Sequence, residues 1–524
     1  MTDSAALIVL IGIFAILVVL ALDKMRPGFT LFAGATAFMA MGIITPEELL
    51  DGFSNREMVT IALLFLIGEG VRQSGALNYL IRHILPQKSG RVGWLMGRIL
   101  PVIASISMVL NNTAVVIIFA PIIKRWSQKI GLPASKFLIP LSYAAILGGL
   151  CTLVGTSTNM VVNGLMIESG YRGFGMFEIG KVGVVIAVLG VIYLMIFGNM
   201  LLPDHRESAA TNDDDEVDEV EGRKITVEII LASRFPGMGK SLKEFDFERH
   251  YGARVKAIRR SGERIDKHLD RQIFTFGDTL VLSTDDAFTR TWRESSAFHI
   301  VSDSAESIDD ELAQPNGGQR WLGLSLLIFL VGGVTLGEWF GGLGGGGELK
   351  FEIFPMAAVV MVIMAVARLF PAKRYTKYIS WDILVAIASA FAISRAISNS
   401  GINELVAMWI ISITKSVGTY GVLALLYLVT MALTELITNN AAVAIAFPIA
   451  VALSQQLGVD PMPLFVAICI AASASFSSPI GYQTNLIVQG VGGYKFRDYV
   501  RVGIWLNLIT FITSVVLIPM LWEF

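Results

Sequence analysis

The sequence predicts an α-helical membrane protein built from one unit that occurs twice in opposite orientations, with a small α/β domain inserted between the copies. Of the 524 residues, 54% are hydrophobic and only 16% are charged, which is far from the usage of soluble domains. Several apolar runs are long enough for a helix to cross roughly 30 Å of hydrocarbon. Small polar residues interrupt these runs at corresponding places in the two halves, as is typical of binding sites in transporters.

The first pair of interruptions is an Asn-Asn turn in each half. Residues 110–113 read Leu-Asn-Asn-Thr and residues 438–441 read Thr-Asn-Asn-Ala. We expect each turn to be the tip of a re-entrant hairpin, because turn backbone at membrane depth is tolerated only where it lines a cavity. On this alignment Asn112 corresponds to Asn440.

The second pair follows further along each half. Residues 155–159 read Gly-Thr-Ser-Thr-Asn and residues 481–485 read Gly-Tyr-Gln-Thr-Asn. The interval from Asn112 to Asn159 is nearly that from Asn440 to Asn485, so one unit is written twice. We expect each stretch to break a membrane-spanning helix.

Each repeat is expected to contain five crossings. The first repeat, residues 1–203, has spans at 5–22, 27–44 and 57–73, an interfacial amphipathic helix at 76–84, a hairpin at 92–126, a broken span at 137–168 and a closing span at 177–202. The second repeat, residues 320–524, has spans at 321–340, 353–370 and 381–399, a hairpin at 418–455, a broken span at 461–489 and a last span at 499–522. Because five is odd, the repeats insert with opposite orientations.

The distribution of charge predicts the orientation in the cell (inner) membrane. With the N-terminus outside, the loops expected to be cytoplasmic carry most of the basic residues: Lys24, Arg26, Arg82, Lys88, Arg91, Lys124, Arg125, Lys129, Lys373, Arg374, Lys377, Lys495 and Arg497. The first run begins with Asp3 and no basic segment, so we expect a retained span and no cleaved signal.

Between the repeats the composition becomes polar. An acidic linker at 204–223 precedes a region of short strands at 224–301, and a second linker at 302–319 returns to the membrane. We expect a cytoplasmic α/β domain that is tethered to the helices and is not packed as a continuation of the bundle.

The polar motifs resemble those of the divalent-anion/sodium symporter family, in the ion-transporter superfamily. The family's Ser-Asn-Thr signature at two hairpin tips falls on residues 111–113 and 439–441, where Asn112, Thr113 and Asn440 match it. Residues 155–159 and 478–485 are similar to the unwound loops that complete the family's sodium sites. The resemblance implies a substrate site at Asn112, Thr113, Asn440, Ala441, Tyr482 and Gln483. It implies sodium ligands at Asn111, Asn112, Gly155, Thr156, Asn159, Thr438, Asn439, Asn440, Gly481, Thr484 and Asn485.

The inserted region resembles the C-terminal regulatory domain of bacterial potassium-uptake proteins (TrkA-C). The residues that carry this resemblance are Pro236-Gly237, Leu242, Tyr251-Gly252-Ala253, Ala257-Ile258 and Gly277-Asp278-Thr279-Leu280. The resemblance, to a subgroup associated with sulfate and sulfur deprivation, implies one regulatory domain, a homodimer, and a nucleotide-like or ionic ligand for that domain.

The chemistry of the motifs agrees with binding an anion together with cations. An Asn side chain offers both an acceptor for a cation and a donor for an anion, and helix N-termini favour anions. No Lys or Arg lies at any of the four motifs, so co-bound sodium ions would neutralise the anion. The sequence predicts no organic cofactor, no enzymatic activity and no nucleic-acid partner.

Several alternatives remain open. The favoured reading is a symporter that takes up a small divalent oxyanion such as sulfate, and the others are a sodium-coupled di- or tricarboxylate transporter and a sulfur-status sensor with little transport. An antiporter should carry Asp at the broken helices, and none is there. A single membrane Asn is usually a contact between helices, but four polar breaks in corresponding positions favour a site. Glu69 and Glu435 fit either a functional or a structural role.

Overall fold

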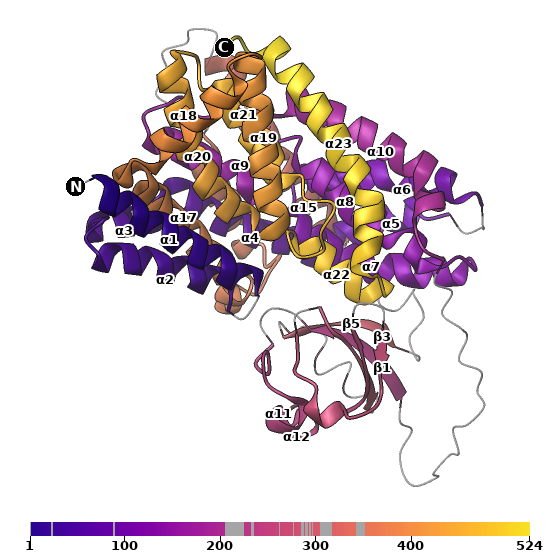
Figure 1. Cartoon of the computed structure of the whole chain (residues 1–524). Coiled ribbons are helices and arrows are strands. Elements are labelled where there is room, and N and C mark those ends of the chain that lie inside the picture. The colour runs from indigo at the N-terminus through magenta and orange to yellow at the C-terminus, as the bar shows by residue number, and fades with distance from the viewer. Residues whose placement is uncertain are drawn as a thin grey trace.

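Helices dominate the protein, and they form one broad body with a separate sheet domain at one end (Figure 1). The computed structural model describes residues 2–22, 25–86, 90–204, 317–341 and 352–524, and 225–303 apart from short gaps. The two predicted linkers fall almost wholly outside the described residues, at 205–224 and 304–316.

The helices of the first half follow the predicted order. They are α1 (Thr2–Ala21), α2 (Pro27–Ala40), α3 (Pro46–Ser54), α4 (Arg56–Gln73), α5 (Ala76–Ile84), α6 (Val92–Ser107), α7 (Asn112–Lys129), α8 (Leu138–Gly149), α9 (Ser157–Glu168) and α10 (Gly180–Leu201). The short helix α3 lies where the sequence analysis had no element. Thr45 caps it, since its hydroxyl accepts from the Glu48 amide while the Glu48 carboxylate accepts from the Thr45 amide.

The second half repeats this order. Its helices are α15 (Gly317–Gly341), α16 (Ile353–Val366), α17 (Trp381–Ser400), α18 (Ile402–Thr414), α19 (Thr419–Leu436), α20 (Asn439–Leu457), α21 (Met462–Ser473), α22 (Gln483–Gly492) and α23 (Phe496–Leu521). Gly75 separates α4 from α5, and Gly401 separates α17 from α18, at positive φ angles of 72° and 75° that favour glycine.

The surface and the helix lengths suit a membrane. By length and composition, six helices within the described residues could cross one: Gly180–Leu201, Gly318–Gly337, Trp381–Ser400, Thr419–Leu436, Asn439–Leu457 and Phe496–Leu521. Other apolar helices are shorter. Large apolar side chains such as Phe14, Val366 and Met520 are more than two-thirds exposed, which marks a surface that contacts lipid or another apolar partner.

The two halves pack in the same pattern. In the first half α6 and α7 both lie on α8, and in the second half α19 and α20 both lie on α21. Between the halves, α7 packs against α22 and α20 packs against α9. Each hairpin therefore lies against the broken helix of the other half.

The inserted region forms an antiparallel sheet with strand order β3-β2-β4-β1-β5. Its elements are β1 (Ile225–Leu231), α11 (Leu242–Phe245), α12 (Phe247–Tyr251), β2 (Arg254–Arg260), β3 (Glu263–Ile265), β4 (Thr279–Thr284) and β5 (Phe298–Asp303). Aromatic rings such as Phe235, Phe247 and Phe274 fill a core of its own, separate from that of the helical body.

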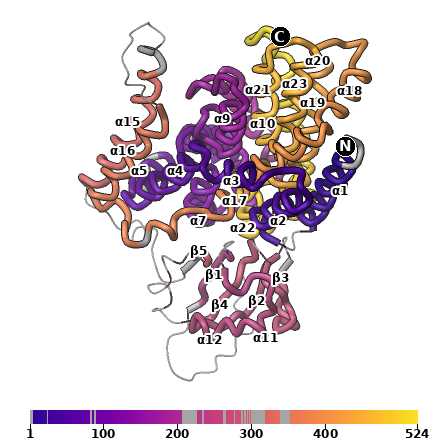
Figure 2. Tube along the Cα trace, turned by 90° about the vertical axis from the view of Figure 1, so that its left-hand side faces the viewer, coloured from indigo at the N-terminus to yellow at the C-terminus, as the bar shows by residue number. Residues whose placement is uncertain are grey.

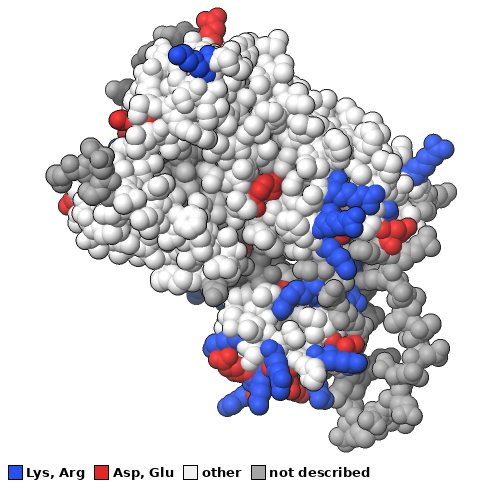
Figure 3. All heavy atoms as spheres, viewed as in Figure 1, with Lys and Arg blue, Asp and Glu red and all other residues white. Residues whose placement is uncertain are grey.

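This α/β domain, which has its own core, also contacts the helices. Both views place it beneath α7 and α22 (Figures 1 and 2). The Glu228 carboxylate on β1 lies 2.9 Å from the Lys124 ammonium on α7, and both side chains are almost buried. Figure 3 shows a helical body with few charges on this face, with Lys and Arg gathered beside and on the α/β domain.

Candidate functional site

The first hairpin tip joins α6 to α7 at the first Asn-Asn turn. Asn111 precedes the helix, and its side-chain oxygen accepts a hydrogen bond from the Thr113 amide at 2.9 Å. Asn112 is 2% exposed. Its amide satisfies its neighbours when the nitrogen donates to Ser107 Oγ at 2.7 Å and to the carbonyls of Ala145 and Gly155 at 3.0 and 3.2 Å. Asn112 thus ties the tip to α8 and to the break that follows it.

The second tip, between α19 and α20, repeats this arrangement around Asn439. The Asn439 amide nitrogen donates to Thr434 Oγ1 at 2.8 Å and to the carbonyls of Ala472 and Gly481 at 3.2 and 3.1 Å. Thr434 lies five residues before Asn439, as Ser107 lies five residues before Asn112. Gly481 occupies in its loop the place that Gly155 occupies in the first.

These contacts correct the alignment of the two tips. Asn112 corresponds to Asn439, and its predicted pairing with Asn440 is wrong by one residue. The corresponding triplets are 111–113, Asn-Asn-Thr, and 438–440, Thr-Asn-Asn, because α7 begins at Asn112 and α20 begins at Asn439. Asn440 therefore takes the place of Thr113.

The two broken helices match residue by residue. In the first, Asn159 Nδ2 donates to the carbonyls of Gly149 and Thr152 at 3.4 and 2.9 Å. In the second, Asn485 Nδ2 donates to the carbonyls of Ser475 and Ser478 at 3.0 and 3.1 Å. The sequence separations, ten and seven residues, are the same in both. Each Asn thus closes the loop that interrupts its helix, by donating to backbone carbonyls on the other side of the break.

Tyr482 joins the two halves at the site. Its hydroxyl donates to the Asn112 side-chain oxygen at 2.6 Å and lies 3.1 Å from Thr156 Oγ1. Sequence reasoning placed Tyr482 in a substrate site but did not predict that it reaches the first tip. The structure therefore brings together the first tip, the first break and the second break.

A second contact between the halves has no counterpart. Ser142 Oγ on α8 donates to Asn485 Oδ1 at 2.7 Å. Ser142 lies 17 residues before Asn159, and the residue 17 before Asn485 is Ile468, on α21. Isoleucine cannot donate a hydrogen bond, and Asn159 Oδ1 is buried without a hydrogen-bond partner among the described residues. The two loops therefore make the same hydrogen bonds to backbone carbonyls, but they differ in whether the Asn side-chain oxygen has a donor among the described residues.

Within the part of the chain that the structure describes, four motif residues have a buried side-chain oxygen without a hydrogen-bond partner. They are Asn159, Thr438, Asn440 and Thr484. Leaving such groups unpaired costs about 1–3 kcal/mol each. Oxygen-only surroundings are what hard cations prefer, and carbonyls at broken helices coordinate sodium in transporters. The residues therefore fit a cation site.

The remaining predicted residues are less informative. Thr113 and Gln483 are half-buried at the first turns of α7 and α22, where free backbone amides favour an anion. Ala441 is buried within α20 and has no polar side chain to offer a ligand.

The structure distinguishes Glu69 from Glu435, which the sequence analysis could not separate. Glu69 accepts hydrogen bonds from its helix neighbours Arg72, at 2.5 and 2.8 Å, and Gln73. Glu435, at the end of α19, instead reaches the second break. Its carboxylate accepts from the amides of Phe476 and Ser477 at 3.1 and 3.0 Å. The same carboxylate also accepts from Ser475 Oγ at 3.2 Å and from Asn507 Nδ2 at 2.6 Å. Glu435 therefore holds the second broken loop in place. Its place close before the second tip, in the run Glu-Leu-Ile-Thr-Asn, was the feature of the sequence that could have indicated this role.

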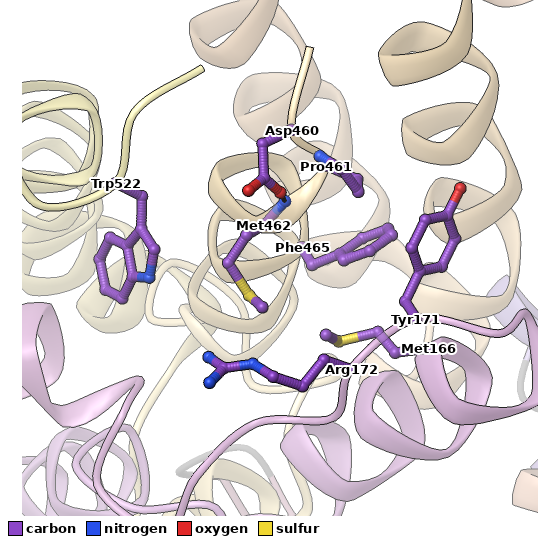
Figure 4. A pocket seen from close by; sticks show the side chains of 8 residues that line it. All are labelled: Met166, Tyr171, Arg172, Asp460, Pro461, Met462, Phe465 and Trp522. Carbon is purple, nitrogen blue, oxygen red and sulfur yellow. Dashed lines mark hydrogen bonds between the residues drawn. The ribbon is translucent and has the colours of Figure 1, made fainter. Parts of the chain in front are cut away.

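Two cavities lie apart from the motifs. The larger, about 290 Å³, has an apolar wall of Met166, Met462, Phe465 and Trp522, with Arg172 and Asp460 at its edge (Figure 4). The smaller, about 50 Å³, lies between α9, α17 and α20 and contains the ion pair of Glu168 with Arg395, 2.8 Å apart. Neither cavity is lined by a motif residue.

Comparison with known families identifies the fold's relatives. A sequence model described as Citrate transporter (CitMHS) matches residues 17–467 and 349–524, which together span most of the chain. The chain belongs to this family. The predicted membership of the ion-transporter superfamily is thereby confirmed, whereas the resemblance of residues 224–301 to potassium-uptake regulatory domains stays a prediction.

Relatives of this member of the citrate transporter family match over nearly their whole length. An uncharacterized transporter of Synechocystis sp. is 29% identical over 97% of this chain and 95% of its own. A Chlamydomonas reinhardtii protein named as a sulfur deprivation response regulator is 27% identical over 93% and 96%. Sodium/sulfate cotransporter 1 of the same alga is 22% identical over 94% and 87%.

A solved structure shares the fold. The YdaH transporter of Alcanivorax borkumensis superposes with a TM-score of 0.51 over 90% of this chain and 86% of its own, at 14% sequence identity. At that identity the likeness concerns the fold alone. Together the family match and the apolar helices establish a multi-pass membrane transporter.

Proposed function

We propose that this protein is a secondary active symporter that takes up a small divalent oxyanion, with sulfate favoured, together with sodium. The observation that carries the proposal is the set of buried, unpaired oxygens at Asn159, Thr438, Asn440 and Thr484, in a site without a single Lys or Arg at its motifs. Oxygen ligands suit sodium, and sodium supplies the positive charge that a bound anion requires. Relatives named as sodium/sulfate cotransporters support the choice of ions.

In this proposal the anion binds between the helix N-termini that begin at the tips and breaks. The first turns of α7, α9, α20 and α22 have free amide N–H groups and a positive dipole end, which favour negative charge. Thr113, Asn440 and Gln483 add side-chain donors around it, and Asn112 and Tyr482 would add theirs by giving up hydrogen bonds that they make in this structure. Sodium would bind the carbonyls of the broken loops and the unpaired oxygens. Binding of both would exchange these contacts between an inward and an outward state.

We further propose that the halves are inverted repeats and that the α/β domain is cytoplasmic. The matched tips and breaks support the repeat, and the basic residues gathered beside the α/β domain support its side of the membrane. The division into 1–203, 204–223, 224–301, 302–319 and 320–524 remains part of this proposal. So do the TrkA-C-like character of the domain, its nucleotide or ionic ligand and a homodimer in the inner membrane.

Two alternatives rest on specific observations. The family description, Citrate transporter, favours a di- or tricarboxylate as the anion. The relative named as a sulfur deprivation response regulator favours a sensor that binds the anion and transports little.

Uptake into liposomes that contain the purified protein tests all three. Labelled sulfate should accumulate under an inward sodium gradient and should not accumulate when potassium replaces sodium or under a proton gradient alone. Unlabelled thiosulfate and molybdate should compete, and citrate and succinate should not. Competition by citrate instead would favour the carboxylate alternative, and saturable binding without accumulation would favour the sensor.

Cysteine labelling tests the orientation in whole cells. Ser208→Cys should react only from the cytoplasmic side and Gly345→Cys only from outside, and both positions lie outside the described residues. The native Cys151 and Cys469 are buried and should stay silent. The opposite pattern would refute the proposed topology.

A further inference from the structure

The α/β domain contacts the helical body through a buried ionic cluster. Glu228 of β1 lies 2.9 Å from Lys124 of α7 and also 2.9 Å from Arg259 of β2. The Lys124 side chain is only 5% exposed and that of Glu228 13%. Removing one partner of a buried pair is strongly destabilising, so this contact holds the domain in one position.

A close approach of backbones adds to the contact. Gly490 of α22 lies so near the loop before β4 that a Cβ built on it would come within 2.1 Å of the Gly277 carbonyl oxygen. Ile230 of β1 is 4% exposed and belongs to the apolar core of the helical body, although its strand belongs to the sheet domain. Only glycine at position 490 permits this fit.

The contacted helices are the two that carry the site. α7 begins at Asn112, and α22 begins at Gln483, directly after Tyr482. These helices pack against each other, and the Tyr482 hydroxyl bonds Asn112 across their junction. A domain fixed to both helices therefore restrains the junction at which the two halves meet.

Among the described residues, the corresponding place in the other pair of helices borders a cavity. Lys124 lies 12 residues after Asn112, and the residue 12 after Asn439 is Val451. Val451 lines the cavity of about 50 Å³ between α9, α17 and α20. One pair of site helices is therefore covered by a domain where the other pair has a hollow, which favours a restraint that acts on one side only.

We propose that the α/β domain is an autoinhibitory latch. Docked through Lys124, Glu228 and Gly490, it holds α7 and α22 together and keeps the site closed, so that its release speeds transport. This inference rests on the proposed symport, because it concerns the rate of that process. A contact can alter transport only if it differs between two states of the carrier, and the latch is such a contact.

Gly490→Ala is the sharpest perturbation, since the added methyl group meets a backbone carbonyl that cannot rotate away. Gly332→Ala on α15 is its matched control, because a Cβ there meets nothing within 4 Å. Lys124→Met is a second variant that removes the charge at similar length while Glu228 keeps Arg259. Lys181→Met, whose ammonium lies over the Trp522 ring on another part of the body, is the matched control.

Docking is measured independently of transport. In an Ile230→Cys background, maleimide should label the buried cysteine slowly in the otherwise native protein and several-fold faster when Gly490→Ala or Lys124→Met is added. In liposomes the same two variants, without the reporter cysteine, should raise the initial rate of sodium-driven sulfate uptake by about five-fold or more, the lower range of typical allosteric coupling. Both controls should leave labelling and uptake unchanged.

Each other outcome overturns a defined part of the proposal. Unchanged labelling in both variants would refute the docked arrangement. Faster labelling with unchanged or reduced uptake would refute autoinhibition and leave the symporter intact. If Gly490→Ala does not fold, Lys124→Met alone decides. If the native protein transports no sulfate, the proposed function fails, while the labelling rates still report whether the domain is docked.

Discussion

Asn159 and Asn485 occupy corresponding places in the two broken helices, but among the described residues only Asn485 has a donor for its side-chain oxygen. Ser142 supplies that donor, and Ile468 stands where the second serine would be. We expect a hydroxyl at position 468 to saturate Asn159 in the same way, because α21 packs against α9 as α8 packs against α22. Ile468→Thr introduces the hydroxyl. Ile468→Val has the same shape without it and serves as the matched control.

The magnitude follows from one hydrogen bond. A neutral bond contributes about 0.5–1.5 kcal/mol net, and sodium would have to break it before using the Asn159 oxygen. Because about 1.4 kcal/mol corresponds to a tenfold change, a bond of about 1 kcal/mol weakens sodium binding by roughly five-fold. The loss of apolar volume, typically below about 1.5 kcal/mol for Ile→Val, is common to both variants and cancels in their comparison.

The assay measures the sodium concentration at which sulfate uptake into liposomes is half-maximal. Ile468→Thr should raise it roughly five-fold relative to Ile468→Val. Equal values in the two variants, with both proteins folded, would show that the Asn159 oxygen is not a sodium ligand. A lower value in Ile468→Thr would mean that the new hydroxyl itself binds sodium, which contradicts the saturation argument.

Three further predictions concern other contacts. Asn112→Ala and Asn439→Ala each remove three hydrogen bonds around a tip, about 3 kcal/mol together. Initial uptake should therefore fall by more than about 100-fold in protein that still elutes as a single species in detergent. Near-native uptake in either variant would show that its tip is not part of the site. Glu435→Gln replaces one acceptor oxygen with an amide nitrogen and should cost about 1.5–3 kcal/mol of stability, measured as a lower melting temperature in detergent. An unchanged melting temperature would show that the carboxylate does not hold the second break. The carboxylate of Asp278, 1% exposed, accepts hydrogen bonds from Arg260 at 2.6 and 2.8 Å. Asp278→Asn should therefore weaken the β2–β4 pairing by about 1.5–3 kcal/mol and speed hydrogen exchange in these strands, with exchange in α20 as the internal control. Exchange in β2 and β4 at the same rate as in the native protein would contradict this prediction.

The order of helices and the position of the site motifs could be predicted because their signals are local. Apolar runs define the spans, and a polar or glycine interruption within a run is visible without a structure. The breaks at Gly155 and Gly481 and the hairpins around the Asn-Asn turns are such signals. The register of the second tip could not be predicted in this way, because two adjacent asparagines look the same when the alignment is shifted by one residue. The hydroxyl five residues earlier, Ser107 or Thr434, would have revealed it.

The remaining features depend on contacts between distant parts of the chain. Tyr482 reaches Asn112 across 370 residues, and the Lys124–Glu228 pair joins two domains. The polar composition of the linkers indicates a tethered domain, but composition does not record whether that domain also has a surface that contacts the helices. Packing of that kind overrides the local signal.

Thr156 and Tyr482 occupy corresponding positions, and they touch each other. If the halves are inverted copies, two equivalent residues can meet only on the axis that relates them, so this pair marks the axis. A tandem of identical copies would bring either two threonines or two tyrosines to that point, and neither pairing reproduces one small and one large side chain. The duplicated units have therefore diverged at their point of contact, where one supplies a large tyrosine ring and the other a small threonine. A single half, expressed twice as separate chains, would not rebuild this junction.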